Sequence, residues 1–311
     1  MNPIFTLLIT TKNRIHDLAF TLNKINHLLN RKDVVCIICD DGSTDGTAHF
    51  IQTNYPEIQF IQNPNSQGLI YSRNRLMSLV TTEFAISLDD DAHFVSEKPL
   101  ECIRNYFEEN ANCGLIAFRI FWGLEEPVSK LSTEIAQQVQ GFVGCGHVWR
   151  MKAWHAIPNY PAWFIFYGEE NFASYQLFKN KLEVHYLPEV LVNHRVDLKS
   201  RKNNNDYVQR QRRSLRSGWY LFFMFLPLKA IPRKMGYSLW MQFNLKVFKG
   251  DFKALLAIVL ALFDLVWNMP RVLINSNRLT AKEYESYTSL SETKLYWQPE
   301  KFRHYSKNRA N

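Results

Sequence analysis

The sequence predicts an α/β fold: a mostly parallel, doubly wound sheet followed by a helical C-terminal appendage that is basic and aromatic. In the first third of the chain, apolar runs of strand length alternate with longer segments of helical periodicity. Polar clusters follow the ends of those runs, which is where ligands bind in sheets of this type. After about residue 200 the composition changes. We therefore expect a domain over residues 1–200 and an appendage over residues 201–311, with the boundary near residues 195–206.

The individual elements follow from periodicity and turn residues. Strands are expected at residues 4–10, 34–39, 58–62 and 84–88, and helices at residues 15–29, 47–54 and 71–80. The pattern loosens after residue 112, where we expect strands at 114–121, 142–149 and 183–186 and a helix at 171–179. With 311 residues, 46% of them hydrophobic, the chain can bury a full core, and a disordered or collagen-like protein is excluded.

The cysteines and the N-terminus both indicate a reducing cytoplasm. The five cysteines are an odd number without the spacing of a disulfide framework. Cys36 and Cys39 stand three apart in a predicted strand, so they face opposite sides and are expected to be core residues. The first residues lack a basic region followed by an apolar signal core, so no secretory signal is expected.

The strongest chemical signal is the run Asp89-Asp90-Asp91 directly after an apolar strand. Three adjacent carboxylates are costly unless a cation compensates them. In extended geometry Asp89 and Asp91 point the same way and offer two oxygen ligands to one Mg²⁺ or Mn²⁺. A helix N-cap accounts for one of these aspartates but not for three.

Two further clusters follow the first and second strands. Thr10, Thr11 and Arg14 can meet a base, a ribose and a phosphate, although short polar residues here also cap helices. Asp40 and Asp41 can accept hydrogen bonds from a uracil-type N–H or a ribose hydroxyl.

Clusters later in the chain are ambiguous when taken singly. Gly68 permits a tight turn into the following helix. Arg73 on that helix can bind a phosphate or carboxylate, or it is a solvated surface arginine. Glu169 and Glu170 offer a general base, or are two acids that stabilise a first helical turn. His194 ends an apolar run and is a candidate third metal ligand, although a lone histidine is more often structural.

Taken together, these motifs resemble family 2 glycosyltransferases. The shared motifs are Thr10–Arg14, Asp40–Asp45, Asn65 with Gly68 and Arg73, Leu88–Asp91 and Gly168–Glu170, in that order, and the resemblance covers roughly residues 3–195. It extends to bacterial rhamnosyltransferase-like members that build polysaccharides. It implies the GT-A fold, an NDP-sugar donor (UDP- or dTDP-sugar) and an inverting reaction.

The resemblance also implies residue roles. Thr10, Asp40 and Asp41 would line the nucleoside pocket, Arg73 would lie near the nucleotide, and Asp90 belongs with this set. Asp89 and Asp91 would form the Asp-x-Asp metal motif, and His194 would reach the metal or diphosphate. The family's second acidic motif is commonly Glu-Asp with the aspartate as base. Here it reads Glu169-Glu170, so Glu170 aligns with the base and the choice between the two stays open.

The appendage carries most of the positive charge. Residues 1–194 hold 15 basic and 21 acidic residues, whereas residues 195–278 hold 16 basic and 4 acidic residues. Such basic, aromatic helices can lie on an anionic membrane surface, and residues 207–229 and 235–252 have that composition. The apolar stretch 254–267 is about half the length of a membrane span and contains Asp264. No recognition motif accompanies the charge, so nucleic acid is not expected as a partner.

The sequence therefore predicts an enzyme at the cytoplasmic face of the cell membrane. Its acceptor would be a glycan or a lipid-linked glycan of the cell surface. One alternative is a catalytically silent, membrane-associated protein of the same fold that only binds nucleotide. A sugar nucleotidyltransferase is a third reading, but it would need a glycine-rich phosphate loop, and residues 10–14 contain no glycine.

Overall fold

A mixed sheet of nine strands forms the centre of the part of the chain that this computed structural model describes, residues 2–196 and 206–299. Neighbouring strands follow the order β3-β2-β1-β4-β8-β6-β9-β5, and β7 pairs with β9 outside this path. The strands are β1 Phe5–Thr11, β2 Val34–Asp40, β3 Gln59–Gln62, β4 Phe84–Asp89, β5 Ala92–Phe94, β6 Cys113–Trp122, β7 Gln137–Gln138, β8 Gly146–Arg150 and β9 Glu183–His194.

Strands β1 to β4 form the parallel half of the sheet, as the sequence predicts. β1 pairs in parallel with both β2 and β4, and β2 with β3. Thr10 therefore lies between Cys39 of β2 and Asp89 of β4. Because the carboxyl ends of parallel strands meet at one edge of a sheet, the polar clusters that follow these strands come together there. β6 and β9 are also parallel, whereas β5, β7 and β8 run antiparallel to their partners.

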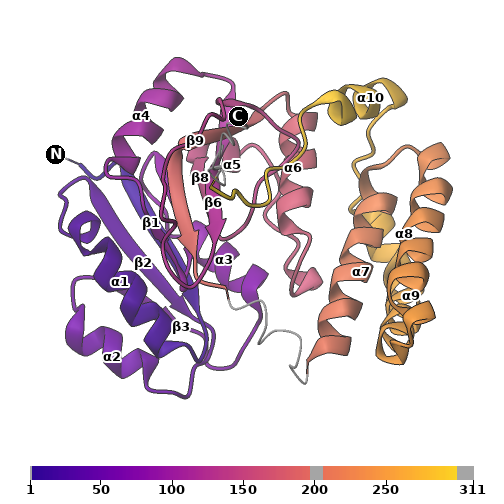
Figure 1. Cartoon of the computed structure of the whole chain (residues 1–311), viewed down its shortest axis with the longest axis horizontal. Helices are drawn as coiled ribbons and strands as arrows, with labels where there is room; N and C mark the ends of the chain where they lie inside the picture. Colours follow the sequence, from indigo (N-terminus) through magenta and orange to yellow (C-terminus); the bar gives the residue numbers. More distant parts are fainter. Residues whose placement is uncertain (1, 197–205, 300–311) are drawn as a thin grey trace, which may run out of the picture.

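Helices cover both faces of the sheet (Figure 1). The helices of this part are α1 Ile15–Leu29, α2 Thr47–Asn54, α3 Leu69–Met77, α4 Pro99–Glu109, α5 Met151–Trp154 and α6 Glu169–Lys179, with a short 3-10 turn at Ala162–Phe164. Apolar residues of α1, α2 and α4 share a core with one face of the sheet, and those of α3, α5 and α6 share a core with the other. Cys36 and Cys39 lie in these two different cores, as their spacing predicts.

Some predicted boundaries were wrong, and helices α4, α5 and α10 (Ala281–Ser289) were missed. The strand expected at 183–186 runs on to His194 through Pro188. This is possible because the register with β6 shifts between Phe118, which pairs with Leu187, and Arg119, which pairs with Leu191. Pro188 therefore has no partner residue in β6, where its missing N–H would break a hydrogen bond. α4 was not predicted, although its buried Leu100, Ile103 and Phe107 have helical spacing. The strand expected at 142–149 begins only at Gly146, as β8, so residues 142–145 are not part of it.

The appendage is a helical layer attached to the sheet domain. It contains α7 Tyr207–Phe225, α8 Ile231–Leu245, α9 Phe252–Ile274 and α10 Ala281–Ser289, with 3-10 turns at Leu228–Ala230 and Val247–Lys249. Figure 1 shows α6 between the sheet and α7, with α8 and α9 beyond α7. The predicted boundary between residues 200 and 201 lies outside the described residues.

The aromatic side of α7 is buried, which corrects the interpretation of residues 207–229 as a membrane-facing helix. Trp219, Tyr220 and Phe225 are at most 1% exposed. They belong to the same hydrophobic core as Leu177 of α6 and Trp149 of the sheet. Burial of several large aromatic side chains against α6 and α9 stabilises the contact between appendage and sheet domain.

α9 is longer than the apolar stretch predicted from the sequence. Among the described helices, it alone is long and apolar enough to cross a membrane by length and composition, and a third of its most apolar window is buried. Its Asp264 is buried and accepts hydrogen bonds from Arg212 of α7, at 2.6 and 2.7 Å, and from Arg216 at 3.4 Å. This ion pair fixes α9 against α7.

Replacing Asp264 with alanine should destabilise the protein, because Arg216 would be left buried without a carboxylate. We expect the free energy of unfolding to fall by about 3 kcal/mol, measured by urea unfolding. Asp206 is the matched control, because it forms an exposed ion pair with Arg210 of the same helix. Asp206→Ala should cost less than about 1 kcal/mol. Equal losses in the two variants would contradict the role given to Asp264.

Candidate functional site

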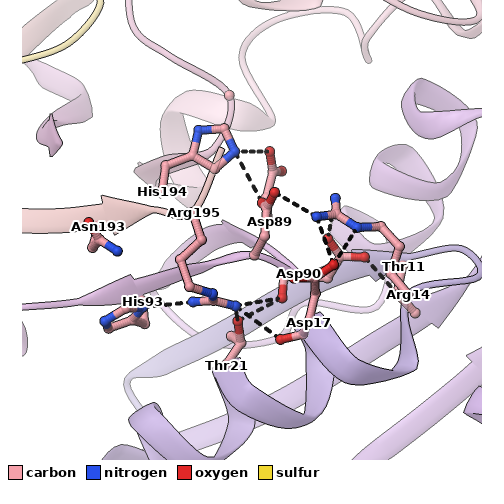
Figure 2. A network of polar contacts seen from close by, with 12 residues as sticks. Thr11, Arg14, Asp17, Thr21, Asp89, Asp90, His93, Asn193, His194 and Arg195 are labelled. Atoms are coloured by element: carbon pink, nitrogen blue, oxygen red, sulfur yellow. Dashed lines mark hydrogen bonds and ion pairs between the residues drawn. The ribbon is translucent and has the colours of Figure 1, made fainter. Parts of the chain in front are cut away.

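The acidic run after β4 lies at the centre of a network of polar contacts (Figure 2). Arg14 contacts Asp90 at 2.9 Å and Asp91 at 2.7 Å. The hydroxyl of Thr11 donates to Asp90 at 2.8 Å. Burial raises the pKa of Asp90, and Arg14 opposes this effect. Burial also acts on Asp91, but His194 and Arg14 outweigh it and hold its pKa well below the ordinary value. Protein cations therefore compensate part of the negative charge of the run.

Asp89, Asp91 and His194 come together as a candidate metal site. One ligand atom from each lies within 4.8 Å of the others. Nε2 of His194 is 3.1 Å from Oδ1 of Asp91 and 4.0 Å from Oδ2 of Asp89. Oδ1 of Asp91 is buried and lacks a hydrogen bond of good geometry to the described residues. Two carboxylates and an imidazole suit a divalent cation such as Mn²⁺ or Mg²⁺, and the orphaned oxygen gives the ion a direct ligand.

The acidic cluster lines a cavity of about 340 Å³ at the carboxyl ends of the strands. Most of the predicted site residues line this cavity: Thr10, Thr11, Arg14, Asp41, Gly68, Asp89, Asp90, Asp91 and His194. Other elements contribute Lys12, Ser66, Leu69, Ser72, Phe166, Arg210 and Arg213. Clusters that are separate in the sequence thus line one pocket in the folded chain.

Asp41 is engaged by the loop that leads into α3. Its two carboxylate oxygens accept hydrogen bonds at 2.6 to 3.2 Å from Ser66, Ser72, Asn63 and the backbone N–H groups of Gln67 and Gly68. Burial opposes them, but these bonds lower the pKa of Asp41. Asp41 lies on the cavity wall and shapes it.

Asp40 and Arg73 were predicted to contact the nucleotide, but neither lies on the cavity wall. Asp40 is fully buried and accepts hydrogen bonds from Ser43 and Gln62. Arg73 is 5% exposed. Its guanidinium contacts Asp89 at 2.9 Å, Glu169 at 2.8 Å and the carbonyl of Gly144 at 2.9 Å. Arg73 therefore links the metal site to the second acidic motif from inside the protein.

The structure separates the two glutamates at the start of α6. Glu169 is 2% exposed and forms an ion pair with Arg73. Glu170 is half-buried and makes no ion pair with the described residues, and its carboxylate lies beside Gly144. Burial raises the pKa of Glu170, whereas Arg73 lowers it. Arg73 thus holds one oxygen of Glu169, the other oxygen lacks a hydrogen bond to the described residues, and Glu170 has no ion pair there.

The loop before α6 is held in a strained conformation. Ile165 and Tyr167 have φ angles of 69° and 70°, which side chains rarely adopt. A Cβ at Gly68 would lie 3.0 Å from the carbonyl oxygen of Ile165, so glycine permits this close approach. The strain lies directly before Glu169 and beside the cavity, where such conformations often position functional groups.

The sequence did not predict the residues that hydrogen-bond to the backbone of the acidic run. The backbone carbonyl of Asp90 accepts a hydrogen bond from the hydroxyl of Thr21 at 2.6 Å. Arg195 donates to Thr21 at 2.6 Å and contacts the Nδ1 atom of His93 at 2.8 Å (Figure 2). Arg195 directly follows His194, and that adjacency was the available signal.

Among Trp122, Trp149, Trp154 and Trp163, whose rings could stack on a sugar, Trp122 lies beside the acidic cluster. Trp149 and Trp154 are buried in the core. Trp163 packs on Tyr220 of the appendage. The ring of Trp122 is 6.1 Å from that of His194 and stacks on Tyr296 at 5.1 Å.

Solved structures of other proteins are similar to this chain in fold. The solved structures include GalNAc-T7 with UDP, GalNAc and Mn²⁺ (TM-score 0.56, 13% identity, 72% of this chain and 48% of that one). TarS of S. aureus has a TM-score of 0.53 and 15% identity, over 67% of this chain and 38% of that one. The mannosyltransferase PcManGT of Pyrobaculum calidifontis, in complex with GDP-Man and Mn²⁺, has a TM-score of 0.54 and 14% identity, over 93% and 84%.

The chain thus spans less than half the length of the first two of these structures, and identities this low show the fold alone. No curated protein matches the sequence. The model of the family described as glycosyl transferase family 2 matches residues 6–167, which is more than half of the chain. The chain therefore belongs to glycosyl transferase family 2 and has the GT-A fold.

Proposed function

We propose that the protein is an inverting transferase that moves a sugar from an NDP-sugar to a hydroxyl of a glycan or lipid-linked acceptor. Cell-surface polysaccharide is the product class that the resemblance to bacterial rhamnosyltransferase-like members favours. The observation that carries the proposal is the separation of two acidic groups. Asp89, Asp91 and His194 form a metal-ligand set, and Glu170 is a separate carboxylate connected to it through Arg73 and Glu169.

The catalytic steps follow from this separation. A divalent cation bound by Asp89, Asp91 and His194 would stabilise the charge on the leaving diphosphate. Glu170, without an ion pair among the described residues, accepts the proton of the acceptor hydroxyl. That hydroxyl attacks the anomeric carbon from the face opposite the nucleotide, and the configuration inverts. Two of the solved structures were obtained with Mn²⁺ and with UDP or GDP-Man, which supports a nucleotide-sugar donor.

The silent alternative predicts nucleotide binding without transfer. A carboxylate that is half-buried, lies beside Gly144 and forms no ion pair with the described residues favours the enzyme. Variants of Asp91 and Glu170 distinguish an enzyme from a silent nucleotide-binding protein.

Asp91→Ala should abolish metal-dependent binding, because it removes the buried oxygen without a hydrogen bond. The measurement is calorimetric titration of Mn²⁺, followed by a panel of UDP-, dTDP- and GDP-sugars. Asp33→Ala is the control, since Asp33 pairs with Arg31 just before β2, at the opposite edge of the sheet. Unchanged Mn²⁺ affinity in Asp91→Ala would refute this metal site.

Glu170→Gln should leave donor binding intact and lower the transfer rate by roughly 10²–10⁴-fold, the usual contribution of a general base. The base acts deprotonated, so parent activity should fall as the pH decreases through its pKa. Because burial raises that pKa, the acid limb should lie above 4.5, the ordinary value for glutamate.

Glu169→Gln is the matched comparison, because it breaks the ion pair with Arg73. It should lower the melting temperature, whereas Glu170→Gln should not. Full transfer activity in Glu170→Gln would assign the base elsewhere.

We also propose that the appendage holds the enzyme at the cytoplasmic face of the membrane. On α9, Phe252, Leu256, Val259, Phe263, Val266 and Trp267 are each more than half exposed, and their spacing of three, four or one places them on one side of the helix. An exposed apolar stripe of this length is unusual for a soluble surface. Exposed Lys229, Arg233 and Lys234 at the start of α8 add charge that anionic lipids attract.

The parent protein should therefore sediment with vesicles that contain anionic phospholipid, and high salt should weaken this association. Phe263→Ser with Trp267→Ser should reduce the bound fraction roughly tenfold or more, because two large apolar side chains no longer enter the interface. Leu131→Ser is the control, since Leu131 is 79% exposed but lies in the sheet domain. Absence of sedimentation of the parent would contradict the proposal.

A further inference from the structure

Two arginines of α7 reach the cavity from the appendage. Arg210 and Arg213 line the same cavity as Asp91 and His194. They stand three residues apart, so they lie on one side of the helix. The family match ends at residue 167, and α7 begins at Tyr207, so this wall lies outside the matched segment.

The other two arginines of α7 hold the helix in place. Arg212 and Arg216 are four residues apart and pair with Asp264 of α9. Arg216 also donates to the carbonyl of Phe164 at 2.7 Å, next to the strained loop before α6. This anchoring gives the cavity side of α7 a defined position relative to the catalytic residues.

Arg213 is a cation without a carboxylate partner among residues 2–196 and 206–299. With the oxygen and nitrogen of its amide exchanged, Gln209 accepts hydrogen bonds from Nε and Nη2 of Arg213 at 3.2 Å, and a neutral amide does not neutralise the charge. Burial and the neighbouring Arg216 and Arg212 lower the pKa of the Arg213 guanidinium. Local positive charge of this kind favours a bound anion.

The other arginines of the cavity pair with carboxylates, whereas Lys12 lines the cavity without an ion pair among the described residues. Arg14 pairs with Asp90 and Asp91. Arg210 pairs with Asp206 at 2.6 Å, although this pair is exposed and therefore weak. A nucleoside diphosphate would meet the metal ligands on one wall, and on the α7 wall it would meet Arg213.

We infer that Arg213, assisted by Arg210, binds the diphosphate of the nucleotide, so that the appendage completes the donor site. The guanidinium fork suits paired phosphate oxygens. The inference rests on the proposed NDP-sugar donor, and it names a residue outside the matched family segment.

The test compares Arg213→Gln with Arg233→Gln, which removes the same charge from α8 outside this cavity. The probes are UDP, dTDP and GDP with Mn²⁺, and the corresponding nucleosides, titrated by calorimetry. For the diphosphate that the parent binds best, Arg213→Gln should weaken affinity roughly 10- to 100-fold, the value of a lost charge-assisted hydrogen bond. Nucleoside affinity should change little, and Arg213→Lys should recover part of the loss.

Several results would overturn the inference. If Arg213→Gln binds the diphosphate like the parent, or loses no more than Arg233→Gln, α7 does not contact the phosphates. An equal loss for nucleoside and diphosphate would indicate a structural role only, and so would failure of Arg213→Lys to bind when it folds like the parent. A parent protein that binds none of the diphosphates would overturn the proposed donor and this inference together.

Discussion

The site depends on one buried guanidinium, that of Arg73. It joins Asp89 at the end of β4, Glu169 at the start of α6 and the carbonyl of Gly144, three groups that are far apart in the sequence. A buried cation must be paired, so this contact fixes the distance between the metal-binding half of the site and the half that holds Glu170. A Cβ at Gly144 would lie 2.7 Å from both the Arg73 guanidinium and the Glu170 carboxylate, so a larger residue there would displace one of these groups.

The acids of the site fall into two groups according to what they contact. Asp40 and Asp41 have both carboxylate oxygens hydrogen-bonded within the protein, and Glu169 has one oxygen paired with Arg73. Asp89, Asp91 and Glu170 keep oxygen atoms available for chemistry. Because neighbouring carboxylates repel, a site with this many acids requires internal cations, and Arg14 and Arg73 provide them.

The appendage belongs to the same folded unit as the sheet domain. The aromatic side of α7 is part of the core beneath α6, and its arginines divide between Asp264 and the cavity. Several of the basic residues after residue 195 therefore pair with a carboxylate of the protein or line the cavity. The surface that we propose for membrane contact is the apolar side of α9 and the basic start of α8.

The sequence by itself determined the parallel half of the sheet and the location of the chemistry. Apolar runs followed by polar clusters place Thr10 and Asp89 at one edge of a parallel sheet, because local periodicity decides the elements and the direction of the strands decides which ends meet. Only the tertiary structure decided which partner each charged side chain takes. Arg73 pairs with Glu169 inside the protein, and Asp41 accepts hydrogen bonds from the loop before α3. Arg213 lines the cavity from α7, which follows the matched segment. Such pairings join residues far apart in the chain, and their energies depend on burial, which no local pattern encodes.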